Sequence, residues 1–302
     1  MSRTYLVRLL TAAASIVVPA ALVVVPAAPA AAVAHGDRVA AGRYRFATKL
    51  TMTGIPTGGG ETRDSWCSGA LVAPRWVITA GHCFRDAAGR RVSETVARRT
   101  VASVGGHDVP VVAAHQAPGY DVALAELATP VTDVTPIRLG TGAPREGEIV
   151  RLLGFGLASG DESAGSPGLR TGRFVVDRVG DTLLDISGRE PRADTSACPH
   201  DSGGPYFTES RGGTAVLVAV VSTGPACPHP GADFAARTDR LGDWITDTTA
   251  GGRGLSFGWA AVPLLIALAA LIIRRRRSGA RRTAPRTAPD DHPARLLVSP
   301  RR

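Results

Sequence analysis

The sequence predicts an all-β fold, a sandwich or a barrel, for its central part, residues 33–248. Short apolar runs recur along this part, and Gly, Pro and Asp, which are typical of turns, separate them. No segment has the hydrophobic period of a helix until its end. The runs are Leu71-Val72, Trp76 to Ile78, Val109 to Ala114, Val122 to Leu127, Ile149 to Leu153, Phe174 to Val176 and Ala215 to Val221.

Residues 1–32 have the pattern of a secretory signal peptide. Arg3 and Arg8 precede a long stretch of Leu, Val and Ala, and Ala30, Ala31 and Ala32 supply a small-residue cleavage site. A retained membrane anchor is the alternative, but the three prolines of this segment argue against it. We therefore expect cleavage, with the following domain outside the cytoplasm.

A second apolar segment lies near the other end of the chain. Leu255 to Ile273 is nineteen residues long without a charge, which is enough to span a membrane as a helix. Arg274 to Arg277 follow at once and predict that the side after the span is cytoplasmic. A buried soluble helix would not be apolar on every face and then end in four arginines. We expect a single-pass type I protein with a linker at 249–254 and a disordered basic tail at 274–302.

The net charge of +9 comes from the two ends of the chain. The tail holds ten Arg and two Asp, and the first segment holds two Arg, so the part between them carries about −1. The basic charge is therefore not on the folded part, which excludes a nucleic-acid partner. It fits the orientation signal and contact with anionic lipid head groups.

Three motifs carry the chemistry. The first runs from Cys67 through Thr-Ala-Gly-His82 to Cys83, the second is Tyr120-Asp121 followed by an apolar run, and the third is Cys198-Pro-His-Asp-Ser202-Gly-Gly-Pro. Alone, each His, Asp or Ser would have an ordinary structural role. All three together, in this order and beside cysteines, predict an activated serine nucleophile.

These motifs resemble the chymotrypsin/trypsin family of serine proteases, in a membrane-anchored bacterial form. The resemblance implies two six-stranded antiparallel barrels at about 33–134 and 135–238, a closing helix at about 239–248, and a catalytic triad in the cleft between the barrels. His82 would be the general base, Asp121 would orient it, and Ser202 would be the nucleophile.

Four cysteines, all in the exported part, predict two disulfides in an oxidising compartment. Spacing alone leaves three pairings open. The resemblance implies Cys67–Cys83 and Cys198–Cys227. A metal site is not expected because the sequence has no CxxC pair, and no cofactor is expected.

The resemblance also places an oxyanion hole at the backbone N–H groups of His200 and Ser202. The family usually has glycine where this chain has His200. That position tends to need a positive φ, which His tolerates better than most residues. A distorted hole would leave a slow enzyme with an intact triad.

The residues expected to form the primary (S1) pocket are Ser196, Ser222, Thr223, Gly224 and Asp233. Ser196 stands six residues before the nucleophile, where trypsin-like specificity needs an acid, and Thr223 replaces the family's usual aromatic. Asp233 would supply an acid from the opposite wall of the pocket. The alternative interpretation of Asp233 is a solvated loop residue. We expect a neutral, small or apolar residue at P1, the position before the cut bond.

Activation is expected to depend on Val33 and Asp201. In the family, a new N-terminal ammonium pairs with the Asp before the nucleophile. Val33-Ala-His-Gly resembles such a terminus, apart from His35 where Gly is usual, and it follows the predicted cleavage site directly. Signal peptidase would then create the active terminus.

Together these expectations describe an extracytoplasmic, membrane-anchored serine endopeptidase that acts on protein or peptide substrates. The alternative is a protease-fold binding module that has lost activity. The feature that favours this alternative is His200, which stands where the family usually has glycine. An esterase is disfavoured because Ser202 does not lie in a Gly-x-Ser-x-Gly elbow. The sequence does not predict the oligomeric state.

Overall fold

The computed structural model describes residues 33–57, 59–85, 89, 96–157 and 168–251. The chain divides into two compact units, Met1–Gly242 and Asp243–Arg302, and all the strands lie in the first. The predicted signal peptide, membrane span and tail lie outside the described residues. Within the described ranges, no helix has the length and apolar character needed to cross a membrane.

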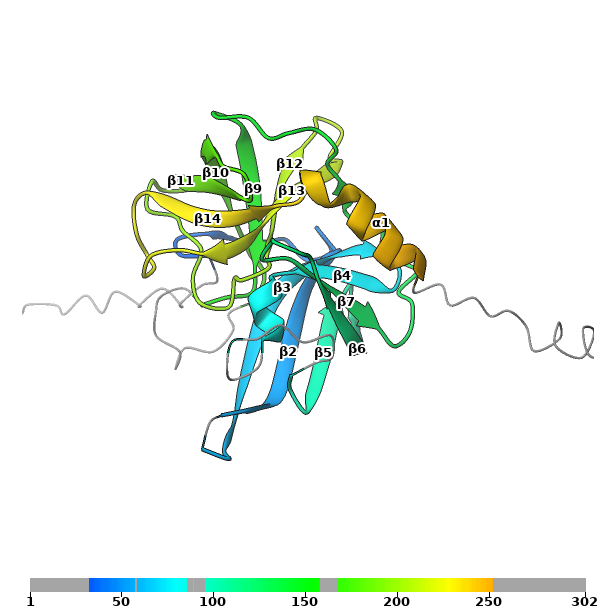
Figure 1. The fold of residues 1–302 in the computed structure, drawn as a ribbon. Coiled ribbons are helices and arrows are strands. Elements are labelled where there is room, and N and C mark those ends of the chain that lie inside the picture. Colours follow the sequence, from blue (N-terminus) through cyan, green and yellow to red (C-terminus); the bar gives the residue numbers. More distant parts are fainter. Residues whose placement is uncertain (1–32, 58, 86–88, 90–95, 158–167, 252–302) are drawn as a thin grey trace, which may run out of the picture. The chain divides into compact units, whose positions relative to one another are not determined.

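Six strands of the first half close into an antiparallel barrel (Figure 1), in the order β2-β3-β4-β7-β6-β5. Sequence neighbours pair, as in β2 with β3, but closure needs the longer-range pairs β2 with β5 and β4 with β7. The strands are β2 (Ala47–Pro56), β3 (Thr62–Ala73), β4 (Trp76–Thr79), β5 (Arg99–Val104), β6 (His107–Gln116) and β7 (Ala123–Leu127).

Six further strands form a second closed ring, in which β9-β10-β11-β14-β13-β12 pair in turn and β12 returns to β9. Two short strands join this sheet: β1 (Asp37–Arg38) pairs with β10, and β8 (Arg138–Leu139) pairs in parallel with β13. The ring consists of β9 (Ile149–Gly154), β10 (Arg170–Val179), β11 (Leu183–Glu190), β12 (Pro205–Glu209), β13 (Ala215–Thr223) and β14 (Ala232–Arg237).

The expected all-β fold with two six-stranded barrels is therefore confirmed, as is a short C-terminal helix. Helical turns are few in the described part of the chain. They are the 3₁₀ turns η1 (Gly81–Phe84) and η3 (Asp239–Leu241) and the helix α1 (Gly242–Gly251). The helix starts slightly later than the expected boundary of about 239.

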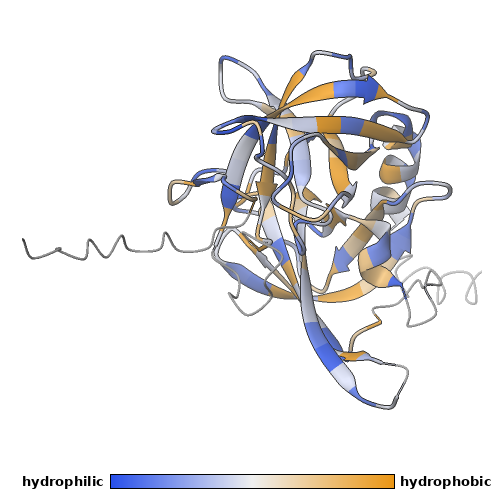
Figure 2. Ribbon diagram, turned by 90° about the vertical axis from the view of Figure 1, so that its left-hand side faces the viewer, coloured by the Kyte–Doolittle hydropathy of each residue, from blue (hydrophilic) through white to orange (hydrophobic). Residues whose placement is uncertain are grey.

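Alternating side chains fill the barrel interiors, and polar and apolar residues alternate along many strands (Figure 2). The second barrel has a core of fully or nearly buried residues to which Val33, from outside its strands, also belongs. The other members are Val150, Leu152, Phe174, Val176, Leu184, Ile186, Ala197, Tyr206, Ala219, Val221 and Ala235. The segment that begins at Val33 is thus anchored inside the second barrel.

Two disulfides brace the loops at the junction of the barrels, with the pairing that the resemblance implies. Cys67 on β3 joins Cys83 in η1, and Cys198 joins Cys227. The first ties the turn that carries His82 to the neighbouring strand. The second ties the loop before Ser202 to the loop after β13. Both loops are therefore fixed covalently close to the candidate site.

Candidate active site

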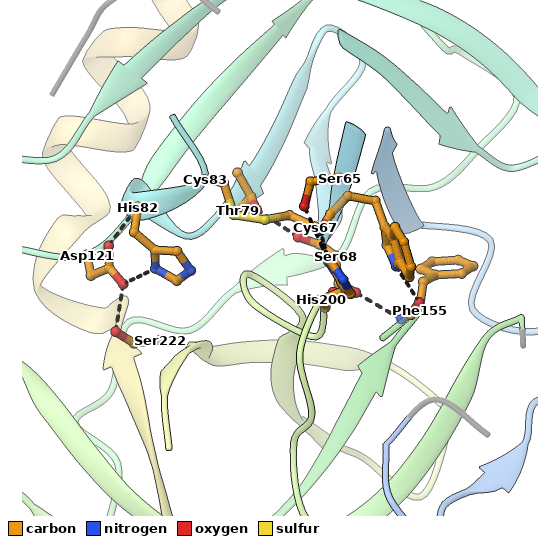
Figure 3. The surroundings of a disulfide bond; sticks show 11 residues. Ser65, Cys67, Ser68, Thr79, His82, Cys83, Asp121, Phe155, His200 and Ser222 are labelled. Carbon is orange, nitrogen blue, oxygen red and sulfur yellow. Dashed lines mark hydrogen bonds and ion pairs between the residues drawn. A yellow bond between two sulfur atoms is a disulfide. The ribbon is translucent and has the colours of Figure 1, made fainter. Parts of the chain in front are cut away.

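His82 and Asp121 meet because of the pairing between β4 and β7. Thr79 on β4 pairs with Ala123 on β7, so the turn after β4 and the loop before β7 lie at the same end of the barrel. The backbone N–H of His82 donates to Asp121 Oδ1 at 2.8 Å, and His82 Nδ1 lies 2.8 Å from Asp121 Oδ2 (Figure 3). This double contact fixes the imidazole with Nδ1 facing the carboxylate.

Asp121 has further partners, and they keep it ionised. Ser222, on β13 of the second barrel, donates its hydroxyl to Asp121 Oδ2 at 2.6 Å, and the Arg85 guanidinium lies 3.6 Å from Oδ1. Burial alone would raise the pKa of Asp121, but the hydrogen bonds from His82 and Ser222 outweigh it and hold that pKa at about 2. The carboxylate is therefore charged over the whole physiological range.

Ser202 follows a tight turn at the junction of the barrels. The Asp201 N–H donates to Cys198 O at 3.0 Å, and His200, the third residue of this turn, has a φ of +75°. These features define a type II turn, which usually has glycine at that place. Ser202 O accepts the Ser68 N–H at 2.9 Å, so the first barrel holds the loop.

Gly203 allows the loop that carries Ser202 to approach the first barrel closely. It has a φ of +81°, and a Cβ at this position would collide with Thr79 and with the Ser68 carbonyl.

In the described part of the chain, Ser202 Oγ has no hydrogen bond to His82. Such contacts are often long in the free enzyme and shorten when substrate binds.

The His200 imidazole lies against the side chain of Trp66. Their rings stack with centroids 3.7 Å apart, and His200 Nδ1 lies 2.8 Å from Trp66 O, to which it donates. Figure 3 shows His200 beside Phe155, across the Cys67–Cys83 disulfide from His82. The His200 carbonyl accepts the Ser68 hydroxyl at 3.0 Å. The side chain that replaces glycine is therefore held outside the turn, and its contacts offset the strain of a positive φ.

Asp201, the last residue of this turn, is fully buried. Its Oδ2 accepts backbone N–H groups from Val33 at 3.2 Å and Cys198 at 3.0 Å, and its Oδ1 accepts that of Gly156 at 2.8 Å. A Cβ at Gly156 would collide with Asp201. Burial raises the pKa of Asp201 to about 7, although the three N–H groups oppose this.

A cavity of about 340 Å³ opens beside Ser202. Four of the expected pocket residues line it together with Ser202: Ser222, Thr223, Gly224 and Asp233. Its remaining lining is Ala197, Cys198, Pro199, Val221, Pro225, Ala226 and Cys227. Ser196, expected on the floor, is fully buried and does not line the cavity. Asp233 is the acidic group of this lining, and it is 1% exposed.

The structure thus gathers most of the predicted site residues at one junction. Sequence reasoning missed the Ser222 contact with Asp121, the Trp66 stack, and His229, whose ring lies against Asp233. No local signal marks these residues. Within the described ranges, no three His, Cys, Asp or Glu side chains cluster as a metal site would require.

Comparison with known proteins gives one family. The model of the family described as Trypsin matches residues 34–245. Serine protease 56 of Mus musculus is 26% identical over 72% of this chain and 38% of its own length. Transmembrane protease serine 9 of Rattus norvegicus is 28% identical over 61% of this chain and 20% of its own.

A smaller relative, Trypsin iota of Drosophila melanogaster, is 30% identical over 53% of this chain and 69% of its own length. The chain therefore spans well under half of the two mammalian relatives and about two thirds of the insect one. The relatives named here are animal proteins, so a bacterial origin stays an expectation.

Proposed function

Because this chain belongs to the trypsin family of serine proteases, we propose that it is an active serine endopeptidase, anchored to a membrane and acting outside the cytoplasm. The observation that carries this proposal is the contact of His82 Nδ1 with Asp121 Oδ2 at 2.8 Å beside a cavity that Ser202 lines. Its substrates are proteins or peptides, and no nucleic acid or cofactor takes part.

The reaction follows the mechanism established for the family. Ser202 Oγ attacks the carbonyl carbon of the scissile bond, and its proton passes to His82 Nε2. The C–N bond then breaks, and His82 returns the proton to the leaving amine. Water hydrolyses the acyl-enzyme by the same route. Asp121, ionised because of its low pKa, stabilises the imidazolium and holds Nδ1–H in place.

The oxyanion that forms on the carbonyl oxygen needs two donors. We assign this role to the backbone N–H groups of His200 and Ser202. Within the type II turn, the Asp201 N–H already donates to Cys198 O. The φ of His200 is positive, as it would be for glycine at this position. Donors fixed before the reaction need no rearrangement in the transition state.

Activation would come from the N-terminal side. Val33 N lies 3.2 Å from Asp201 Oδ2 inside the second barrel. Cleavage before Val33 would turn this amide into an ammonium facing a buried carboxylate. The resulting ion pair would stabilise the turn that carries His200 and Ser202.

Membrane anchoring rests on the uncharged stretch at 255–273 and the four arginines after it. The rat relative is named as a transmembrane protease, which supports this part of the proposal. The strand-rich part would then lie outside the cytoplasm, attached through a short linker.

A fluorophosphonate probe tests the proposal, since it labels only an activated serine. We expect the full-length protein to be labelled and Ser202→Ala to stay unlabelled. Ser103→Ala, which removes a half-buried hydroxyl on β5 that donates to Asp108, is the matched control and should label normally. A folded, secreted protein that takes up no probe would instead support the alternative, a binding module without activity.

A further inference from the structure

A buried histidine and a buried aspartate form a pair at the wall of the cavity. His229 Nε2 lies 3.1 Å from Asp233 Oδ1, and the two side chains are 8% and 2% exposed. Asp233 lines the cavity and His229 lies behind it. The same Oδ1 faces Gly224, where a Cβ would collide with it. A P1 side chain that enters the cavity therefore meets Asp233, with His229 behind it.

The hydrogen-bond partners of the His229 ring indicate which of its nitrogens carry a proton. Nδ1 lies 3.2 Å from Pro230 O, and a carbonyl oxygen can only accept, so Nδ1 carries a proton. Nε2 faces a carboxylate oxygen, so a second proton must lie between them. Whether that proton belongs to His229 or to Asp233, the pair has no net charge.

The other contacts of the pair leave this balance unchanged. Asp233 Oδ2 accepts the Ala197 N–H at 2.8 Å, and the His229 N–H donates to the Ser196 hydroxyl at 3.3 Å. The other titratable groups that affect Asp233 or respond to it are the fully buried Tyr206 phenol and the Asp201 carboxyl. Neither brings a positive charge, so within the described residues His229 is the basic side chain that faces Asp233.

We propose that His229 is a specificity-determining residue, which neutralises Asp233 and makes the primary pocket select a neutral P1 side chain against Lys and Arg. This inference rests on the proposed peptidase function. An acid in the pocket would by itself attract a basic P1 residue, because opposite charges in a buried site attract strongly. With the imidazole behind it, a basic P1 residue would lose its hydration without gaining a net opposite charge.

The test compares kcat/KM for peptides that differ only in Leu or Arg at P1. The wild type should prefer Leu. In His229→Asn the amide still donates to Asp233 but carries no charge, so we expect the Arg/Leu ratio to rise about tenfold or more. The double variant with Asp233→Asn should return to a ratio near that of the wild type. His107→Asn, which breaks an exposed His–Asp pair on β6, is the matched control and should leave the ratio unchanged.

An unchanged ratio in His229→Asn, or a wild type that already prefers Arg, would overturn the proposal. If His229→Asn does not fold, ¹⁵N NMR of the histidines in the full-length wild type decides. A proton on His229 Nδ1 near neutral pH supports the neutral pair, and an Nε2–H tautomer with a bare Nδ1 overturns it. A wild type without any Ser202-dependent cleavage would contradict the proposed function instead, and the NMR measurement would still report on the pair.

Discussion

The free energy of unfolding should depend on whether the chain begins at Val33. In a chain that continues before this residue, Asp201 is fully buried and accepts backbone N–H groups from Val33, Gly156 and Cys198. Burial raises its pKa from 3.8 to about 7. In the unfolded chain the carboxyl loses its proton near pH 4. Between about pH 4 and pH 7 the folded state therefore binds a proton that the unfolded state has released. Stability must fall as the pH rises through this window.

The size of the effect follows from the pKa difference. About three pKa units at about 1.4 kcal/mol each amount to about 4 kcal/mol lost by pH 7. In a chain that begins at Val33, an ammonium would lie where the Val33 N–H now lies, 3.2 Å from Asp201 Oδ2. It would lower the pKa of Asp201 and remove most of this loss.

Urea unfolding in detergent, from pH 4 to pH 8, measures this difference. One protein begins at Val33, a second keeps Ala32 in front of it, and a third carries Asp201→Asn in the longer form as the control. The first two should have similar stability near pH 4 and diverge by up to about 4 kcal/mol at pH 7. The control should lack this divergence. Parallel curves for the first two proteins would refute the reasoning, as would full peptidase activity of the Asp201→Asn substitution placed in the chain that begins at Val33.

Three further outcomes are expected. Cys198→Ser should lower the free energy of unfolding by about 2–5 kcal/mol in urea titrations and reduce peptidase activity, because this disulfide braces the loop before Ser202; a variant as stable and active as the wild type would argue against that role. Trp66→Ala should reduce kcat about two- to tenfold with little change in KM, since ring stacking contributes about 0.5–1.5 kcal/mol; the same substitution should have little effect once His200→Gly removes the stacked ring. A long Gly/Ser insert before Leu255 should reduce cleavage of substrates at the membrane surface and leave cleavage of a soluble peptide unchanged; equal cleavage of both would show that the anchor only retains the enzyme.

The strand pattern was sufficient to predict an all-β fold, but the residues themselves left sandwich and barrel open. Apolar alternation reports which face of a strand is buried and does not identify its partner. Closure depends on pairs far apart in sequence, such as Thr48 with Val104 and Tyr206 with Leu152. The choice of barrels came from the resemblance, whose motifs identify a family.

The candidate site shows the same limit at the level of single residues. Motifs of adjacent residues were visible, but the contact of Ser222 with Asp121 joins positions 101 residues apart. His229 lies four residues from Asp233, yet their contact depends on the path of the loop after Cys227. Ser196 was expected on the pocket floor by counting back from Ser202. In the structure it is fully buried and accepts the His229 N–H.

The division of the site between the barrels has a consequence for biosynthesis. His82 and Asp121 belong to the first barrel, and Ser202 and Ser222 belong to the second. If the protein is the exported peptidase proposed above, a half-exported chain would have a base without a nucleophile, and hydrolysis would begin only after both barrels have folded and docked. The export machinery and neighbouring unfolded chains would be protected from cleavage during this interval.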